Sequence, residues 1–395
     1  MKKTHLRILA LLCAVVMALG LFGCAKDEPA QQPADNTPAA AGDQAPGAPA
    51  ENTEPPAEDN QPAEPAPQPA QTVDHEGVTW AFQQDEYKLC CYWPGPDEFF
   101  DNYVLQGIKG FEADFGQTVE YAVGTEWTQN VENQTVEALA AQGYDCFMIF
   151  GADTAGANGL YKELYDNGCQ VINYAGLVDD PQESAFTLAS NVYTQAYEST
   201  KQLIEYMGGE GTIINVLENL NDVNTVKRQQ GVEDAVAEHP NVSICQTVAD
   251  IKTVDEGYTK VSDALTANPD AKGIIATGGT ASKGVANALS DYYATNASAE
   301  HVFAATQDQS TEVMNGIAAG QIDHTVGQNG YGMGYVSNVL LMYLKDGWTP
   351  KTWGQHIDTG MVFITKDNMD TYQKDIEQVT NDLVATIETD ILNKP

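Results

Sequence analysis

Between residues 92 and 100 the sequence gathers aromatic rings around one carboxylate. Tyr92, Trp93, Phe99 and Phe100 flank Asp97 in the stretch YWPGPDEFF. Flat apolar rings beside a hydrogen-bond acceptor are what a pocket needs to hold a small polar ligand that has apolar ring faces. The two phenylalanines could instead cap the core where a helix starts, and composition alone leaves both interpretations open.

The pattern around these residues predicts a strand, a loop and a helix. The apolar run 89–93 is typical of a strand, and Pro94-Gly95-Pro96 breaks it. Apolar residues then follow at helical spacing, at Phe99, Phe100, Val104, Ile108 and Phe111. In a doubly wound α/β protein the loop after the first strand lies at the cleft, because it is free of the sheet's hydrogen bonds. We therefore expect the aromatic cluster at a cleft.

The other residues capable of chemistry form no catalytic or metal-binding pattern. The six histidines are scattered and lack metal-ligand spacing. No serine has glycine both two residues before and two residues after it, so there is no nucleophile elbow. We therefore expect a protein that is not an enzyme and that uses no metal and no cofactor.

The N-terminus predicts export. Basic residues precede an apolar run from Ile8 to Leu19, which is shorter than a membrane-spanning helix. Leu21-Phe22-Gly23-Cys24 follows and resembles the bacterial lipobox. The resemblance implies a signal peptide over residues 1–23, and a diacylated Cys24 that anchors the protein outside the cytoplasm on the cell membrane. Ordinary secretion is the alternative.

The next segment, 24–79, predicts a disordered tether. From Ala25 to Thr79 the sequence has no Phe, Trp or Tyr, and it holds eleven of the 18 prolines. Such a segment buries too little apolar surface to offset the entropy lost on ordering. The formal charge of −37 (19 basic against 56 acidic residues) argues against nucleic acid as a partner.

Most of the cysteines are predicted to be core residues. Of seven, Cys13 lies in the signal and Cys24 would carry lipid. The others sit in or beside apolar runs and form no C-x-x-C motif; they are Cys90, Cys91, Cys146, Cys169 and Cys245.

The remaining residues, about 315 from Trp80 on, exceed what one core usually supports, so we expect two lobes. Strand-like runs alternate with helical patterns, in two successive series. Strands are predicted at 118–123, 145–150, 170–174, 186–190, 212–217, 243–248, 273–277, 302–306 and 323–328, and helices at 131–141, 156–167, 195–207, 225–238, 256–266 and 281–293. This alternation predicts the α/β class, with parallel sheets and helices on both faces.

The order of these elements and several short strings resemble the ribose-binding-protein-like group of type I periplasmic binding proteins. The resemblance covers most of residues 87–372. The strings stand in the family's order: the loop 94–100 ending in two phenylalanines, AQGYD at 141–145, KRQQG at 227–231, ANPD at 267–270, GQI at 320–322, TVGQ at 325–328 and IDTG at 357–360.

The resemblance implies two doubly wound parallel-sheet lobes joined by a hinge with three chain crossings, near Asn191, Gln328 and Asp358. Lobe one would comprise residues 80–191 and 329–357, and lobe two residues 192–328 and 358–395. In this family the ligand lies between the lobes and closes them.

The resemblance also implies site residues. Asp308 and Gln328 match the family's ligand-binding aspartate and glutamine, and Phe99 and Phe100 match its stacking pair. Asp97 stands where an asparagine often does, and Trp93 lies in the same aromatic loop.

Four polar positions of the family are substituted. Its Asp-Arg pair is replaced by Ala175-Gly176, an expected arginine by Val226 and an expected asparagine by Gly278. A sugar would then leave hydroxyls unpaired unless other side chains replace these groups. Candidates near the same loops are Tyr174, Asn173, Trp127, Asn191 and Asn224.

The function implied is that of a monomeric, lipid-anchored, extracytoplasmic solute-binding protein. It would capture a small polar ligand, a sugar or a sugar-like compound, and deliver it to the permease subunits of an ABC importer. Two alternatives stay open. The protein could be the ligand-sensing component of a receptor system, or the ligand could be a nucleoside or an autoinducer-like furanone.

Overall fold

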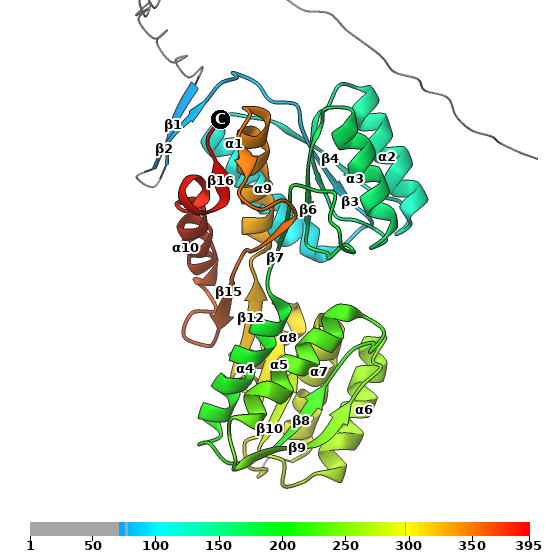
Figure 1. Ribbon diagram of the computed structural model, residues 1–395. Helices are drawn as coiled ribbons and strands as arrows, with labels where there is room; N and C mark the ends of the chain where they lie inside the picture. Colours follow the sequence, from blue (N-terminus) through cyan, green and yellow to red (C-terminus); the bar gives the residue numbers. More distant parts are fainter. Residues whose placement is uncertain (1–70, 76–77, 297) are drawn as a thin grey trace, which may run out of the picture. The chain divides into compact units, whose positions relative to one another are not determined.

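The computed structural model describes residues 71–75, 78–296 and 298–395. They include two α/β lobes, each built on a six-stranded sheet with helices on both faces (Figure 1). The predicted fold class is therefore confirmed. The predicted signal peptide, Cys24 and the tether up to residue 70 lie outside the described residues. Within the described ranges, no helix is long and apolar enough to cross a membrane.

The sheet of lobe one has the strand order β14-β7-β6-β5-β3-β4, and all its neighbours are parallel. Its strands are β3 (Leu89–Trp93), β4 (Val119–Val123), β5 (Cys146–Ile149), β6 (Gln170–Tyr174), β7 (Phe186–Ala189) and β14 (Gln355–Asp358). Successive side chains of a strand point to opposite faces. Cys91 and Trp93 thus pack in one core, whereas Cys90 and Tyr92 pack in the other.

Helices cover both faces of this sheet. One face carries α1 (Leu105–Phe115), which follows the π-helical turn η1 (Phe100–Val104), and α9 (Gly330–Lys345). The other face carries α2 (Gln129–Ala141) and α3 (Gly156–Asp166). Thr128 begins α2 by accepting a hydrogen bond from the Val131 N–H, as N-cap residues do.

Two glycines let α1 and α9 touch backbone to backbone. A Cβ atom placed on Gly107 would lie 2.0 Å from the carbonyl oxygen of Tyr331, and one on Gly334 would lie 2.2 Å from that of Val104. Both distances are far below van der Waals contact, so each position requires glycine.

The sheet of lobe two has the order β15-β12-β11-β10-β8-β9, and only β15 runs antiparallel to its neighbour. Its strands are β8 (Gly211–Val216), β9 (Val242–Val248), β10 (Gly273–Ala276), β11 (Phe303–Gln307), β12 (His324–Gln328) and β15 (Met361–Ile364). One face carries α4 (Val192–Tyr206) and α5 (Val223–Ala237). The other carries α6 (Val254–Ala267), α7 (Gly279–Thr295) and α8 (Thr311–Ala318).

Hydrogen bonds join the segments that cross between the lobes. Ser190 follows β7, Asn329 follows β12, and Gly360 precedes β15. The Ser190 hydroxyl donates to the Gly360 carbonyl (2.7 Å) and accepts from the Asn329 N–H (3.1 Å). The Asn329 amide donates to the carbonyl of Thr359 (2.7 Å). The three crossings therefore form one connected hinge.

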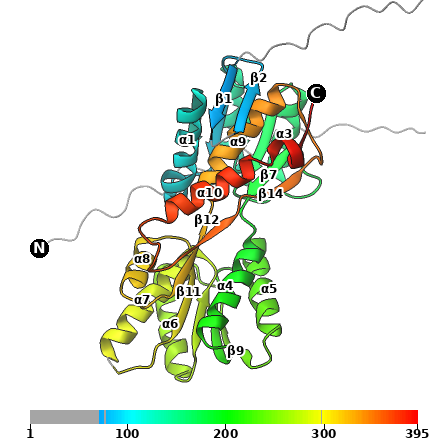
Figure 2. The same ribbon diagram turned by 90° about the vertical axis from the view of Figure 1, so that its left-hand side faces the viewer.

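The allocation of residues 358–395 to lobe two needs a correction. Only the first part of this segment, including β15, belongs there. Helix α10 (Tyr372–Val384) starts against the core of lobe two at Tyr372 and ends in the core of lobe one at Val384 (Figure 2). The turn η2 (Ile387–Ile391) and β16 (Leu392–Asn393), paired with β13 (Thr349–Pro350), also belong to lobe one. Helix α10 thus crosses between the lobes in addition to the hinge.

The end of the expected tether also folds. Strands β1 (Gln71–His75) and β2 (Val78–Phe82) form an antiparallel hairpin, where the sequence analysis placed disordered chain up to residue 79. Trp80 and Phe82 anchor it, because both are buried in the core of lobe one beside Phe115 and Tyr343. The carboxylate of Asp346 accepts hydrogen bonds from the Gln83 N–H and the Tyr87 hydroxyl, both at 2.7 Å.

The described cysteines are free thiols, and four of them are buried in lobe one as expected: Cys90, Cys91, Cys146 and Cys169. Cys245 differs, because it is exposed. It lies in β9, the strand at the edge of the lobe two sheet.

Lobe two buries a histidine within its sheet. His324, the first residue of β12, places its Nε2 2.9 Å from the Ser199 hydroxyl and packs its ring against Tyr206 and Phe363. Burial lowers the pKa of His324 to about 4, although the neighbouring Asp323 carboxylate acts in the opposite direction.

Acid should therefore destabilise the fold through His324. In the unfolded chain a histidine has a pKa of about 6.5, so below that pH the unfolded state binds a proton that the folded state excludes. Above pH 6.5 His324 contributes no pH dependence. As the pH falls from about 6.5 to 4, the free energy of unfolding should decrease by an amount that approaches about 3 kcal/mol. Urea unfolding across this range should show a shallower pH dependence for His324→Gln than for the unchanged protein.

His301 provides a control of opposite sign. A hydrogen bond to Asp323 raises the pKa of His301, so its contribution is present below pH 6.5 and is lost as pH rises through the raised pKa. His301→Gln should therefore leave the acid-side loss intact. If the free energy of unfolding of His324→Gln and of the unchanged protein fell in parallel with pH, the acid-induced loss could not be assigned to His324.

Candidate functional site

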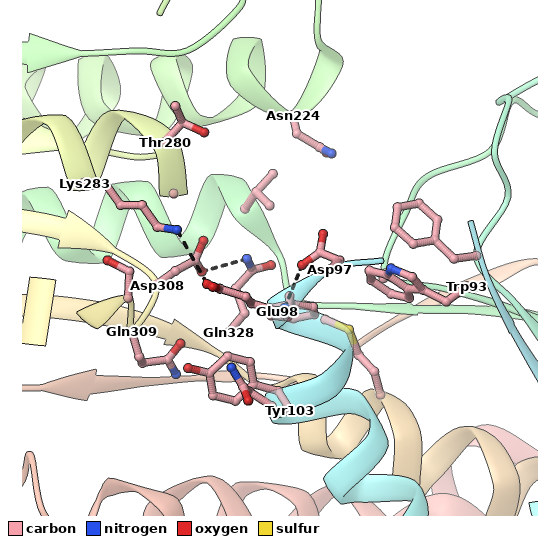
Figure 3. Close-up of a pocket in the computed structure, with 18 of the residues that line it drawn as sticks. Trp93, Asp97, Glu98, Tyr103, Asn224, Thr280, Lys283, Asp308, Gln309 and Gln328 are labelled. Carbon is pink, nitrogen blue, oxygen red and sulfur yellow. Dashed lines mark hydrogen bonds and ion pairs between the residues drawn. The ribbon is translucent and has the colours of Figure 1, made fainter. Parts of the chain in front are cut away.

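A cavity of about 520 Å³ lies between the two lobes, within the usual range for small-molecule sites (Figure 3). Lobe one contributes all the aromatic side chains of the lining, and lobe two contributes mostly polar ones. The residues that line it are Trp93, Asp97, Glu98, Phe99, Asn102, Tyr103, Phe150, Ala175 and Met333 from lobe one, and Val192, Asn224, Arg228, Gly279, Thr280, Lys283, Asp308, Gln309, Ser310, Thr311 and Gln328 from lobe two.

The aromatic wall comes from the carboxyl ends of adjacent strands. Trp93 ends β3, and Phe150 follows β5. Their ring centroids are 4.7 Å apart in an edge-on arrangement, and Phe99 stacks on Trp93 at 6.2 Å. The Asp97 carboxylate accepts a hydrogen bond from the Phe99 N–H (2.6 Å), which holds the turn before η1 in place. The site therefore offers flat apolar faces next to a carboxylate.

The polar wall centres on Asp308, which follows β11. Its Oδ1 accepts a hydrogen bond from the Gln328 side-chain amide at 2.9 Å. Burial raises the pKa of Asp308 above its ordinary value, while the hydrogen bond from Gln328 and the nearby Arg228 guanidinium act to lower it. An aspartate oxygen at this place can accept hydrogen bonds from ligand hydroxyl groups.

The backbone at Asp308 is strained. Its φ is 66°, in the left-handed region, and Ala175 on the opposite wall has a φ of 61°. For residues other than glycine this conformation costs about 1 to 2 kcal/mol. The Asp308 conformation is held by its own N–H, which donates to the Val326 carbonyl (2.9 Å), and by the Thr325 hydroxyl, which donates to its carbonyl (2.8 Å). Strain held in this way is typical of ligand sites.

Two further polar groups at the cavity lack partners. Both side-chain polar atoms of Gln309 are buried and have no hydrogen-bond partner within the described part of the chain, and the same holds for the Nε of Arg228. Unpaired buried groups cost about 1 to 3 kcal/mol each.

One ion pair bridges the two lobes at the rim. The Lys283 ammonium lies 3.6 Å from the Glu98 carboxylate, and the Glu98 side chain is 82% exposed (Figure 3). Such an exposed pair contributes little to stability.

The structure brings five of the eight ligand-binding candidates to the cavity: Trp93, Asp97, Phe99, Asp308 and Gln328. Three others lie elsewhere. Phe100 is buried in the core of lobe one, where it stacks on the inner side of Trp93 (5.3 Å). Tyr174 is also in that core, with its hydroxyl 3.1 Å from the Tyr92 carbonyl and 3.2 Å from Cys91 Sγ.

Asn191 has a structural task at the hinge. Its side chain accepts a hydrogen bond from the Thr194 N–H and so caps α4. It lines a second, smaller cavity of about 80 Å³ that shares Ala175, Val192 and Asn224 with the main one. Among the other residues considered as replacements, Asn224 lines the main cavity, whereas Asn173 is buried and bonded to the Tyr161 hydroxyl.

One substituted position lies outside the cavity. Val226 stands where the resemblance implies an arginine, but its side chain is 49% exposed and it does not line the cavity. Arg228, two residues later on α5, does. Residues two apart on a helix point in different directions, so Val226 and Arg228 cannot both face the cavity.

The charged lining could suggest a metal centre, but the geometry does not form one. In the described ranges, no group of three or more His, Cys, Asp and Glu side chains could hold a metal ion.

Residues 92–348 match the family model described as "Periplasmic binding protein domain". The chain belongs to this family. The predicted type I periplasmic binding protein fold is also confirmed, because solved structures of such proteins share it.

Among curated proteins of the family, the chain is similar to a D-apiose import binding protein of Actinobacillus succinogenes, with 28% identity over 196 residues. That alignment covers 50% of this chain and 63% of the relative, so the chain matches less than two thirds of the relative's length.

Solved structures of periplasmic binding proteins share the fold. An arabinose-binding protein of Geobacillus stearothermophilus has a TM-score of 0.65 at 18% identity, covering 73% of this chain and 99% of the other. A periplasmic ribose ABC transporter protein of Conexibacter woesei has a TM-score of 0.65 at 18% identity, covering 74% and 96%. A solute-binding protein of Burkholderia graminis in complex with D-arabinose has a TM-score of 0.62 at 20% identity, covering 73% and 99%.

Proposed function

We propose that the protein captures a small polar solute, a sugar or a sugar-like compound, between its two lobes and delivers it to an ABC importer. The observation that carries this proposal is the cavity itself, in which the Trp93 and Phe99 rings of lobe one accompany the polar side chains of Asp308 and Gln328 on lobe two. The relatives named for apiose, arabinose and ribose support the same class of solute.

The lining suits a hydroxyl-bearing ring. Aromatic faces remove the C–H faces of such a ring from water, and a carboxylate, an amide and a guanidinium pair with its hydroxyls through charge-assisted hydrogen bonds. The Arg228 guanidinium supplies a polar group at the cavity beyond the ligand-binding residues expected from the sequence. It offsets part of what Ala175 and Gly176 lack.

The proposed mechanism is capture without turnover. The solute would bind the groups of both lobes at once, and its contacts would favour the closed arrangement of the hinge at Ser190, Asn329 and Gly360. The closed form would then be the form that the permease subunits recognise. We propose that the protein acts as a monomer outside the cytoplasm.

A ligand screen tests this function. The full chain would be heated with millimolar pentoses, hexoses, polyols, nucleosides, amino acids and short peptides. A solute at about 1,000 times its Kd should add about 4 kcal/mol to the free energy of unfolding and raise the melting temperature by several degrees. Stabilisation by amino acids or peptides alone would overturn the assignment to sugar-like solutes.

The lipid anchor is a separate proposal, on a residue outside the described ranges. We propose that Cys24 carries the lipid, because it follows Leu21-Phe22-Gly23 after a short apolar run. Cys24→Ser should release the protein from the membrane fraction into the medium or periplasm, as measured by fractionation and immunoblotting. Cys13→Ser, which changes a cysteine within the signal segment, should leave retention unchanged. Equal retention of both variants in the membrane fraction would contradict the proposed lipid anchor at Cys24.

A further inference from the structure

Trp127 presents an exposed ring in a fixed orientation. It lies in the loop between β4 and α2, and 51% of it is exposed. Its indole N–H donates to the Ala152 carbonyl at 3.1 Å, and its ring meets Phe150 edge-on, with centroids 5.0 Å apart. The Ala152 peptide is itself held, because its N–H donates to the buried carboxylate of Glu132 (2.5 Å). The ring is therefore held in place while half of its surface meets solvent.

This ring continues the aromatic wall of the cavity. Trp93 and Phe150 line the cavity, Phe150 contacts both tryptophans, and the Gly124 N–H at the start of the Trp127 loop donates to the Trp93 carbonyl at 2.7 Å. Figure 3 shows Trp93 at the opposite end of the cavity from Lys283 and Gln309. The cavity thus has a polar end and an aromatic end, and Trp127 lies beyond the aromatic end.

Exposed apolar side chains also lie on both lobes near the cavity. Most of the exposed large apolar side chains of the described chain belong to two elements next to the cavity. Tyr121, Val123 and Trp127 lie on or just after β4 in lobe one, and Leu220, Val223 and Val226 lie on or just before α5, the helix that carries Asn224 and Arg228. Single exposed apolar residues need no explanation, but a group beside a ligand cavity does.

We propose that Trp127 forms a second subsite, and that the solute has two rings. The first ring is a sugar ring, held at the polar end by Asp308 and Gln328. The second ring, joined to the sugar as in a disaccharide, an aryl glycoside or a nucleoside, stacks on the exposed face of Trp127. This inference rests on the proposed function, because it specifies the solute class of the same cavity.

Paired probes test the second subsite. Calorimetric titrations of the full chain would compare D-ribose with adenosine, D-xylose with xylobiose, and D-glucose with phenyl β-D-glucoside. In at least one pair the two-ring compound should bind at least tenfold more tightly than its one-ring partner. Trp127→Ala should reduce this ratio to about one, through weaker binding of the two-ring compound only. Trp127→Phe, which keeps a ring, should retain part of the ratio.

Trp353 provides a matched control. It is a 43%-exposed tryptophan of the same lobe, its indole N–H donates to the Gln182 carbonyl at 3.1 Å, and its ring meets Tyr165 edge-on at 4.9 Å. Unlike Phe150 beside Trp127, neither of these two partners lines the cavity. Trp353→Ala should leave every dissociation constant unchanged.

The possible failures are distinguishable. Equal affinities within every pair for the unchanged protein would overturn the two-ring solute while leaving sugar capture intact. A large ratio that survives Trp127→Ala would place the second ring elsewhere and overturn the subsite. If Trp127→Ala does not fold, two measurements still test the subsite. They are the affinity ratio of the two-ring to the one-ring compound for the unchanged protein, and the reduction of that ratio in Trp127→Phe. An absence of binding for all six probes would overturn the two-ring solute, and the wider ligand screen described above would then decide whether the protein captures sugars.

Discussion

Asp308→Asn should weaken solute binding by ten- to a hundredfold and leave the unliganded protein as stable as before, or more stable. A hydrogen bond to a charged group contributes about 1.5 to 3 kcal/mol, and about 1.4 kcal/mol corresponds to tenfold in affinity. Asparagine keeps the shape of the side chain, tolerates the left-handed φ of 66° and can still accept the hydrogen bond from Gln328. It also removes a charge that burial disfavours.

Two comparisons make this result specific. Asp308→Ala should also lose affinity, but it should lower stability by about 1 kcal/mol because alanine disfavours a left-handed φ. Asp346→Asn changes a partly buried, hydrogen-bonded aspartate far from the cavity, and weakens its bonds to Gln83 and Tyr87. It should lower stability and spare affinity. Calorimetry and urea unfolding of the three variants measure both quantities. An unchanged dissociation constant in Asp308→Asn would move the binding site elsewhere.

The second large effect concerns the contact between α1 and α9. Gly334→Ala should destabilise the protein by at least about 2 to 3 kcal/mol, the upper part of the usual range for overpacking. The added methyl group would lie 2.2 Å from the Val104 carbonyl oxygen, so the two helices must separate. Since backbone atoms form the obstacle, no side chain can move away to make room. Gly107→Ala should behave alike, because its methyl group would meet the Tyr331 carbonyl from the other helix.

Gly159→Ala is the matched control. Gly159 also lies within a helix, α3, but a Cβ atom there would meet nothing within 4 Å. Alanine is favoured over glycine in helices by about 0.5 to 1 kcal/mol, so this variant should be slightly more stable than the unchanged protein. Urea unfolding measures the three substitutions. Similar effects at Gly159 and Gly334 would show that the close approach of α1 and α9 does not limit stability.

The elements themselves could be predicted from the sequence because their signals are local. Strand β6 occupies residues 170–174 as expected, and most other strands and helices end within three residues of the predicted positions. Short runs rich in apolar residues, separated by amphipathic stretches, favour a parallel sheet with helices on both faces. The place of helix α10 could not be predicted in the same way, because its sequence pattern does not show that it crosses from one lobe core to the other.

The site could be predicted only in part, for reasons of side-chain direction. Asp308 and Gln328 stand at strand ends, where direction follows from position along the edge of the sheet. Tyr174 and Phe100 stand one residue away from cavity-lining positions and point into the core instead. Gln309 and Lys283 carried no signal in the sequence, because their place at the cavity depends on how β11 and α7 meet the other lobe.

Both ends of the described chain belong to lobe one. The hairpin β1–β2 packs there, and β16, close to Pro395, pairs with β13. Most of lobe two, from α4 to β12, is therefore an insertion between segments of lobe one and has no free end. Fluorophores fused at residue 71 and at the C-terminus would move as one body, so the distance between them would report nothing when a solute arrives. A biosensor built on this protein needs one of its two labels within lobe two, for example at the naturally exposed thiol of Cys245.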